Sequence, residues 1–191
     1  MKDAITKMFE DSMSVKQDTL DTNIDLIIQT VEVITASLKQ NGKILFFGNG
    51  GSAADSQHIA AEFIGRFMKE RKALAAIALT TDSSVLTCLG NDYSYEIIFS
   101  RQIEALGNKE DVAFGISTSG NSINVIEGIK QAKQQGLKTI VMTGGGGGKL
   151  KGMADIHLDV PSKSTARVQE SHMCIYHAIC ELVENNFATQ P

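Results

Sequence analysis

The chain has 191 residues and a mass of 20.6 kDa, with 42% hydrophobic residues, 21% charged residues and a formal net charge of −4. This length suits one domain with a hydrophobic core, and the composition excludes a disordered chain. The acidic charge argues against duplex nucleic acid as a ligand, and no apolar run approaches the roughly 20 residues that span a bilayer. We therefore predict a single domain over residues 1–191 with neither a nucleic-acid nor a membrane partner.

The N-terminal segment and the cysteines indicate the cellular compartment of the protein. The opening segment, MKDAITKMFEDS, contains acidic residues and no apolar stretch of the kind that a secretory signal needs. The three cysteines form no C-x-x-C pair, which argues against a disulfide framework and against a cysteine-based zinc site. These features predict a cytoplasmic protein with reduced thiols.

A long helical region opens the chain over residues 3–39 and stops at Asn41-Gly42. Apolar residues at steps of three and four form one face of it: Leu20, Ile24, Ile27, Ile28, Val31, Ile34 and Leu38. Ile5, Met8 and Phe9 indicate an earlier apolar stripe. This is more apolar surface than one small sheet can cover, so we expect residues 1–41 to pack in an oligomer.

Short apolar runs alternate with amphipathic segments from residue 43 onward. We expect strands at residues 44–47, 75–79, 112–116, 139–142 and 156–160. We expect helices at residues 52–67, 122–135 and 165–186, with shorter pieces within 82–106. This alternation predicts an α/β fold, with a five-stranded parallel sheet between two helical layers. Ligands of such folds bind at the carboxyl ends of the strands.

Two loops share a position and a chemistry. Gly48-Asn49-Gly50-Gly51-Ser52 follows the first strand and opens a helix, and Ser117-Thr118-Ser119-Gly120-Asn121-Ser122 does the same after the third. Unpaired N–H groups at a helix start attract anions, and hydroxyls add neutral donors, so both loops suit a phosphate group. In the alternative interpretation Ser52 and Ser122 only cap their helices. The four hydroxyls of the second loop exceed what capping requires.

Neither loop carries a nucleotide motif of the P-loop type. Gly48, Gly50 and Ala53 match the dinucleotide pattern G-x-G-x-x-A, but no acidic residue ends the second strand. We therefore expect no nucleotide cofactor. The five glycines of Gly144–Gly148 predict only a mobile connection.

Candidate acid–base groups lie on two of the predicted helices. His58 and Glu62 are four residues apart and share a helix face, although a solvated face would show the same spacing. Arg66 continues that face and could hold Glu62 or a substrate oxygen. Gln169 and His177 can share one side of the last helix, where the apolar neighbours of His177 predict its burial.

Asn91-Asp92 is typical of a turn, and its short polar side chains could also contact sugar hydroxyls. Hydroxyl-rich loops without a nucleotide motif suit a phosphorylated sugar. A carboxylate beside a histidine suits proton transfer between carbons next to a carbonyl, through an enediol.

In combination these motifs resemble the bacterial phosphoheptose isomerases of the sugar isomerase (SIS) domain superfamily, whose fold is flavodoxin-like. The motifs are GNGGS at 48–52, H-x-x-x-E at 58–62, GND at 90–92, GISTSGNS at 115–122, and R-x-Q-E-x-H at 167–172 followed by His177. The resemblance implies isomerisation of D-sedoheptulose 7-phosphate, a phosphorylated seven-carbon sugar, to D-glycero-D-manno-heptose 7-phosphate. This reaction opens nucleotide-activated heptose synthesis for lipopolysaccharide or capsule.

The resemblance also implies roles for particular residues, with Glu62 as the general base and His177 as the general acid. The expected substrate contacts are Asn49, Gly50, Gly51, Ser52, Glu62, Arg66, Asn91, Asp92, Ser117, Thr118, Ser119, Ser122 and Gln169. One zinc ion per subunit is implied at His58, Glu62, Gln169 and His177, in a homotetramer whose sites lie near subunit interfaces. A carboxylate held on zinc is a weaker base, so both roles of Glu62 stay open.

Two other functions stay open at this point. The superfamily includes a non-catalytic adaptor that binds a replication initiator protein, and it includes isomerases or sensors of other phosphosugars. The adaptor branch lacks the acid and the base together, so the presence of Glu62 and His177 favours an enzyme. The loops do not determine how many carbons the sugar has. Ala166 departs from some relatives, which have an acidic residue there.

Overall fold

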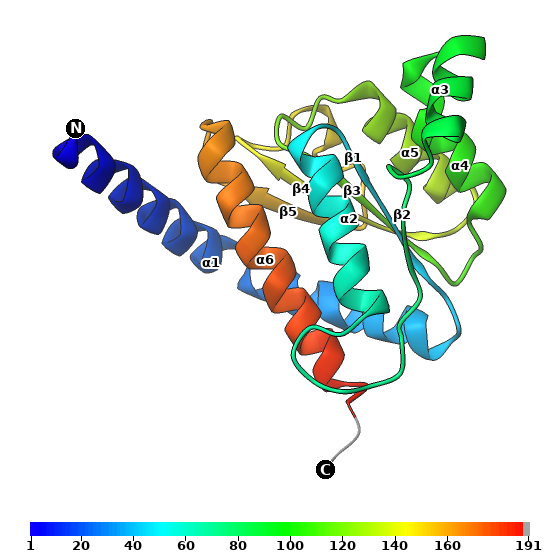
Figure 1. The fold of residues 1–191 in the computed structure, drawn as a ribbon, viewed down its shortest axis with the longest axis horizontal. Coiled ribbons are helices and arrows are strands. Elements are labelled where there is room, and N and C mark those ends of the chain that lie inside the picture. Colours follow the sequence, from blue (N-terminus) through cyan, green and yellow to red (C-terminus); the bar gives the residue numbers. More distant parts are fainter. Residues whose placement is uncertain (189–191) are drawn as a thin grey trace.

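The computed structural model describes residues 1–188 and confirms the predicted α/β fold, with a parallel sheet between two layers of helices (Figure 1). The strands are β1 (Ile44–Gly48), β2 (Ala76–Ala78), β3 (Val112–Ser117), β4 (Lys138–Gly144) and β5 (Ile156–Val160). Their order in the sheet is β2-β1-β3-β4-β5, and all pairings are parallel. The chain reverses its direction of winding between β1 and β3, which is where ligands bind in sheets of this kind.

Helices cover both faces of this sheet. One face carries α1 (Lys2–Lys39), α2 (Gly51–Ile64) and α6 (Thr165–Asn185). The other carries α3 (Ser83–Asp92), the short 3₁₀ helix η1 (Tyr95–Ile97), α4 (Ile98–Leu106) and α5 (Ile123–Gln134). Successive strand residues point to opposite faces. Phe46 therefore packs on Phe63 and Phe114 in one apolar core, while Phe47 packs on Phe99 in the other.

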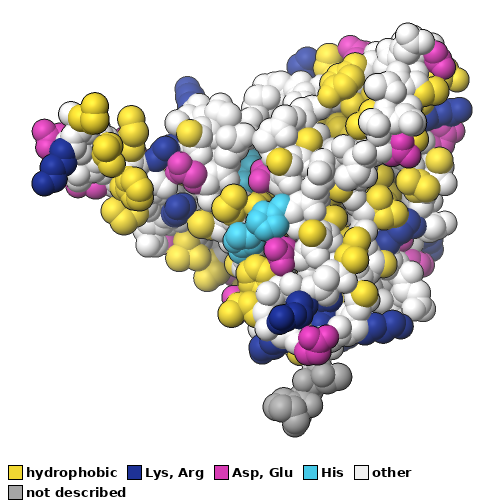
Figure 2. Space-filling model, in the orientation of Figure 1, with side chains coloured by type: hydrophobic (Ala, Val, Ile, Leu, Met, Phe, Trp, Pro, Cys, Tyr) yellow, Lys and Arg dark blue, Asp and Glu magenta, His cyan; other side chains and the backbone are white. Residues whose placement is uncertain are grey.

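The helix α1 extends well beyond the sheet, toward the N-terminus marked at the left of Figure 1. Its second half buries Val31 and Ile34 against the sheet. Much of the predicted apolar surface is nevertheless exposed, at Ile5, Met8, Phe9, Leu20, Ile24 and Ile28, and Met13 is exposed as well. Figure 2 shows hydrophobic side chains gathered along the projecting part of α1. No helix within residues 1–188 has the length and hydropathy needed to cross a bilayer.

The glycine run is more structured than the expected mobile connection. Gly144 ends β4, and Gly148 begins the 3₁₀ helix η2 (Gly148–Leu150). The four residues Gly145 to Gly148 have φ angles of 63°, 95°, 84° and 50°, a region that other residues rarely adopt. The carbonyl of Gly147 lies so close to Gly120 that a side chain on Gly120 would collide with it. The glycine run therefore packs against the loop of residues 117–122, which we call the serine-rich loop.

Candidate active site

The loop after β1 is fixed by its polar contacts. Gly50 is the N-cap of α2, with a φ of 56°, so Ser52 lies inside the helix and not at its cap. The amide of Asn49 exchanges two hydrogen bonds of 2.8 Å with the amide of Asn124 on α5. The hydroxyl of Tyr95 also donates to Asn49 Oδ1, at 3.3 Å. Asn124 and Tyr95 thus position this loop, and no sequence motif had singled them out.

The loop after β3 lies beside the first because β1 and β3 are neighbours in the sheet. Ser122 takes the N-cap position of α5, but its hydroxyl makes no capping hydrogen bond. It bonds instead to the hydroxyl of Ser117, at 2.9 Å. The interpretation that Ser52 and Ser122 are only caps is therefore wrong, and their hydroxyls are placed at the ligand-binding end of the sheet.

The helix α6 joins the two loops. The amide of Gln169, in its first turns, lies against Gly51, so a side chain at Gly51 would displace this amide. A cavity of about 270 Å³ separates the start of α6 from the serine-rich loop, and it is lined by Thr118, Ser119, Gly144, Gly145, Ser162, Lys163, Thr165 and Val168. Lys163 adds a positive charge here that the sequence patterns did not identify. Hydroxyls, helix N-termini and a lysine together favour an anion.

The predicted acid–base residues come together further along α2 and α6, which lie side by side (Figure 1). His58 Nε2 is 3.1 Å from Glu62 Oε1, and the ring of His58 is 5.2 Å from the ring of His177. Figure 2 shows histidine side chains next to acidic ones on this face of the molecule. The Glu62 side chain is 21% exposed, so water and a small ligand can reach it. We call His58, Glu62 and His177 the acid–base cluster.

His177 is only half-buried, which corrects the predicted burial. The apolar run around it packs into the core through Ile175 and Tyr176, while His177 itself faces α2 and the ring of Phe67, 5.5 Å away. Partial burial and the neighbouring His58 lower the pKa of His177. A neutral imidazole keeps one N–H donor, which suits a group that hydrogen-bonds a substrate oxygen.

Three predicted substrate contacts make hydrogen bonds or ion pairs with their own neighbours in the sequence. Asn91 and Asp92 occupy the last turn of α3 and not a turn between elements, and the amide of Asn91 donates to Asp92 at 2.8 Å. Arg66 lies beyond the end of α2, is exposed, and pairs with Glu70 at 3.8 Å. The prediction that Arg66 continues the face of Glu62 is therefore wrong, because the helix ends too early.

A buried ion pair explains why α2 ends there. The carboxylate of Glu184 accepts hydrogen bonds of 2.7–2.8 Å from the backbone N–H groups of Phe67, Met68 and Lys69. Arg71 Nε lies 3.3 Å from the same carboxylate, and Arg71 also donates to the carbonyl of Glu62 at 2.7 Å. These contacts replace the hydrogen bonds of another helical turn. They also fix Phe67 beside His177.

The donor set predicted for zinc is suitable in kind, with two imidazoles, a carboxylate and an amide oxygen. Three of its members, His58, Glu62 and His177, lie together, while Gln169 contacts the first turn of α2. Within residues 1–188, no three His, Cys, Asp or Glu side chains are already arranged to hold a metal ion. Binding would therefore require these side chains to turn.

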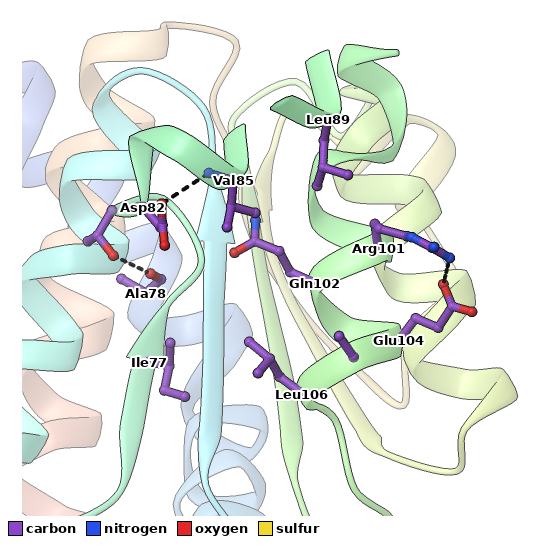
Figure 3. A pocket seen from close by; sticks show the side chains of 11 residues that line it. Ile77, Ala78, Asp82, Val85, Leu89, Arg101, Gln102, Glu104 and Leu106 are labelled. Carbon is purple, nitrogen blue, oxygen red and sulfur yellow. Dashed lines mark hydrogen bonds and ion pairs between the residues drawn. The ribbon is translucent and has the colours of Figure 1, made fainter. Parts of the chain in front are cut away.

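A larger cavity, of about 700 Å³, lies elsewhere, at the β2 edge of the sheet between α3 and α4 (Figure 3). Its lining is mostly apolar, with Ile77, Val85 and Leu106, and its ion pair joins Arg101 to Glu104 at 2.6 Å. None of the predicted site residues lines it. Size alone therefore does not identify the active site.

The fold defines a flavodoxin-like α/β protein with two polar loops at the carboxyl ends of β1 and β3. Residues 8–144 match the profile of the SIS domain family, so the chain belongs to this family. It is 52% identical over 184 residues to the phosphoheptose isomerase of Aquifex aeolicus, a match that covers 96% of both chains. It is 48% identical over 186 residues to that of Helicobacter pylori, covering 97% of both.

Solved structures agree with these sequence relatives. The phosphoheptose isomerase from Neisseria gonorrhoeae superposes with a TM-score of 0.91 at 44% identity, covering 96% of this chain and 98% of that one. A phosphoheptose isomerase from Francisella tularensis gives 0.92 at 38% identity, covering 96% and 97%. The long N-terminal helix is thus included in the shared architecture.

Replacing Glu184 by Gln should destabilise the fold by about 3–5 kcal/mol, because it leaves Arg71 buried without its partner. Although burial opposes ionisation of Glu184, the backbone donors and Arg71 hold its pKa below the ordinary value. Its ionised form therefore stabilises the fold above the unfolded-state pKa, and this contribution is lost as the pH falls through the folded-state pKa. Urea titrations of the wild type and of Glu184→Gln, between neutral and acidic pH, measure the free energy of unfolding and its pH dependence. A variant of equal stability and unchanged pH dependence would contradict the role of Glu184.

Proposed function

We propose that the protein is an aldose–ketose isomerase that converts D-sedoheptulose 7-phosphate to D-glycero-D-manno-heptose 7-phosphate. The observation that carries this proposal is the acid–base cluster of His58, Glu62 and His177, on α2, which begins at the loop after β1, and on α6, which packs beside it. The phosphoheptose isomerases that match nearly the whole chain support the choice of substrate. The product would be the first intermediate in heptose synthesis for lipopolysaccharide or capsule.

The phosphate group binds at the serine-rich loop in this mechanism. Ser117, Thr118, Ser119 and Ser122 offer hydroxyl donors, and the start of α5 offers backbone N–H groups. Lys163 lines the adjoining cavity and supplies a positive charge. The sugar then extends toward Gln169 and the acid–base cluster. Asn49, Gly50, Gly51 and Ser52 form the wall beside it.

Two side chains move the protons. The Glu62 carboxylate removes a proton from C1 of the ketose, and the C–H electrons form the C1=C2 double bond while His177 protonates O2. The O1 hydroxyl of the enediol then gives its proton to His177 as the C1=O bond forms, and the C1=C2 electrons take the carbon proton back from Glu62 at C2, which gives the aldose. Because C1 is oxidised while C2 is reduced within the same molecule, no redox cofactor is needed.

We also propose one zinc ion per subunit, bound by His58, Glu62, Gln169 and His177. The donor chemistry and the contact between His58 and Glu62 support it. When bound, zinc would polarise the carbonyl or hydroxyl of the substrate as a Lewis acid. In that case Glu62 would serve as a ligand, and its strength as a base would fall.

A cytoplasmic homotetramer is the third part of the proposal. The exposed apolar residues of α1 support burial against other copies, because a monomer would leave them in water. Assembly would also bring a second chain near each site, which could complete it where Asn91, Asp92 and Arg66 do not reach. The cysteines are all unpaired, which suits a compartment that keeps thiols reduced.

The replacement Glu62→Gln should lower kcat/KM for sedoheptulose 7-phosphate by about 10²- to 10⁴-fold, because the amide cannot accept the carbon proton. The fold should be unaffected. NMR detection of the aldose anomeric proton measures turnover, with ketose phosphates of other chain lengths as a substrate panel. Glu181→Gln, an exposed carboxylate on α6, is the matched control. Undiminished activity of Glu62→Gln would refute the assigned base. Faster turnover of another ketose phosphate would refute the substrate.

Purified protein should carry one zinc per chain, and His177→Gln should lose most of it, because a four-ligand site loses one imidazole. Metal analysis after gel filtration measures this. His157→Gln serves as the control, since His157 lies on β5 and bonds to Thr143. Equal zinc content in His177→Gln and in wild type would exclude the proposed site.

Introducing Leu20→Lys and Ile24→Lys together should dissociate the tetramer, because two charges would replace apolar side chains at the interface between copies. Light scattering at micromolar concentration reports the mass. Gln29→Lys places the same charge at another exposed position of α1 and should leave the assembly intact. A wild-type protein that is monomeric under these conditions would refute the proposal.

A further inference from the structure

The hydroxyl of Tyr176 contacts His58 of the acid–base cluster from the side of the core. The tyrosine ring is buried in the core, with 1% of its surface exposed. Its hydroxyl oxygen lies 3.2 Å from His58 Nδ1 and 3.4 Å from Asp55 Oδ1. Asp55 and His58 are both on α2, whereas Tyr176 comes from α6. The contact therefore links the two helices directly beneath the cluster.

The hydrogen bond between Tyr176 and His58 has a direction that follows from Glu62. An ionised carboxylate only accepts hydrogen bonds, so His58 Nε2, 3.1 Å from Glu62, carries the hydrogen of the neutral ring. His58 Nδ1 is then an acceptor, and Tyr176 is the donor that faces it. This contact favours one tautomer of His58, the one that directs N–H at Glu62.

Asp55 gives the hydroxyl a second acceptor. If a cation takes His58 Nε2, the ring hydrogen moves to Nδ1. The Tyr176 oxygen then accepts from Nδ1 while its own hydrogen turns to Asp55.

We propose that Tyr176, backed by Asp55, is a positioning residue that holds the orientation of the His58 ring and thereby directs the Glu62 carboxylate toward the substrate. The inference rests on the proposed function, in which Glu62 moves the carbon proton. Tyr176 does not itself touch the substrate. Its removal should therefore slow the chemical step and leave substrate binding largely intact.

The test combines kinetics with spectroscopy on the intact oligomer. Tyr176→Phe removes only the hydroxyl and keeps the buried ring, and Tyr93→Phe makes the same change at an exposed tyrosine. We expect Tyr176→Phe to lower kcat about three- to tenfold, as for loss of one hydrogen bond, with KM changed less than about twofold. The thermal unfolding midpoint should stay close to that of wild type. Tyr93→Phe should leave all three unchanged.

Labelling of the histidine rings with ¹⁵N gives a readout that does not depend on turnover. The His58 signals, assigned by their absence in His58→Gln, should shift in Tyr176→Phe and not in Tyr93→Phe. A double-mutant cycle tests the part of Asp55. Asp55→Ala should lower kcat in the wild-type background but have no further effect in Tyr176→Phe, because Asp55 acts through the hydroxyl.

Two results would overturn the inference. Unchanged His58 nitrogen signals in Tyr176→Phe would show that the hydroxyl does not hold the ring. Shifted signals with an unchanged kcat would show that the contact does not direct Glu62. A wild-type protein that fails to convert sedoheptulose 7-phosphate would instead refute the proposed function, and the ¹⁵N comparison alone would then decide whether Tyr176 holds His58.

Discussion

The active-site geometry depends on the packing of α2 against α6. Gly51 and Gln169 are in contact where the two helices begin, and Glu184 binds the backbone just beyond the end of α2. These contacts at both ends set the register in which His58 and Glu62 face His177. A slip of either helix by one residue would rotate its side chains by about 100° and separate the acid from the base.

The sheet provides the second half of the site. Because β1 and β3 are adjacent and parallel, the loops that follow them lie next to each other, and the amides of Asn49 and Asn124 join the two sides. The glycine run packs against the serine-rich loop, where Gly147 approaches Gly120 closely. The anion site that we propose therefore lies at the carboxyl ends of β1 and β3.

Local patterns were sufficient to predict the strands, most helices and the two loops, because these follow from apolar periodicity and from helix starts. The spacing of His58 and Glu62 likewise predicted a shared helix face. Contacts between distant segments were not predictable. Glu184, which lies on another helix, binds the backbone just after α2, so the predicted position of Arg66 on the face of Glu62 was wrong. The apolar neighbours of Tyr176 indicate only a core residue. The contact of its hydroxyl with His58 depends on how α2 packs against α6.

Isomerisation of sedoheptulose 7-phosphate in D₂O tests the central claim most directly. Glu62 is partly exposed to water, so a proton that it takes from C1 should exchange before its return to C2. The account predicts an aldose product with deuterium at C2, detected by NMR as loss of the C2 proton signal. A product formed at normal rate whose C2 carries only the hydrogen that left C1 would contradict proton transfer through a water-exposed Glu62.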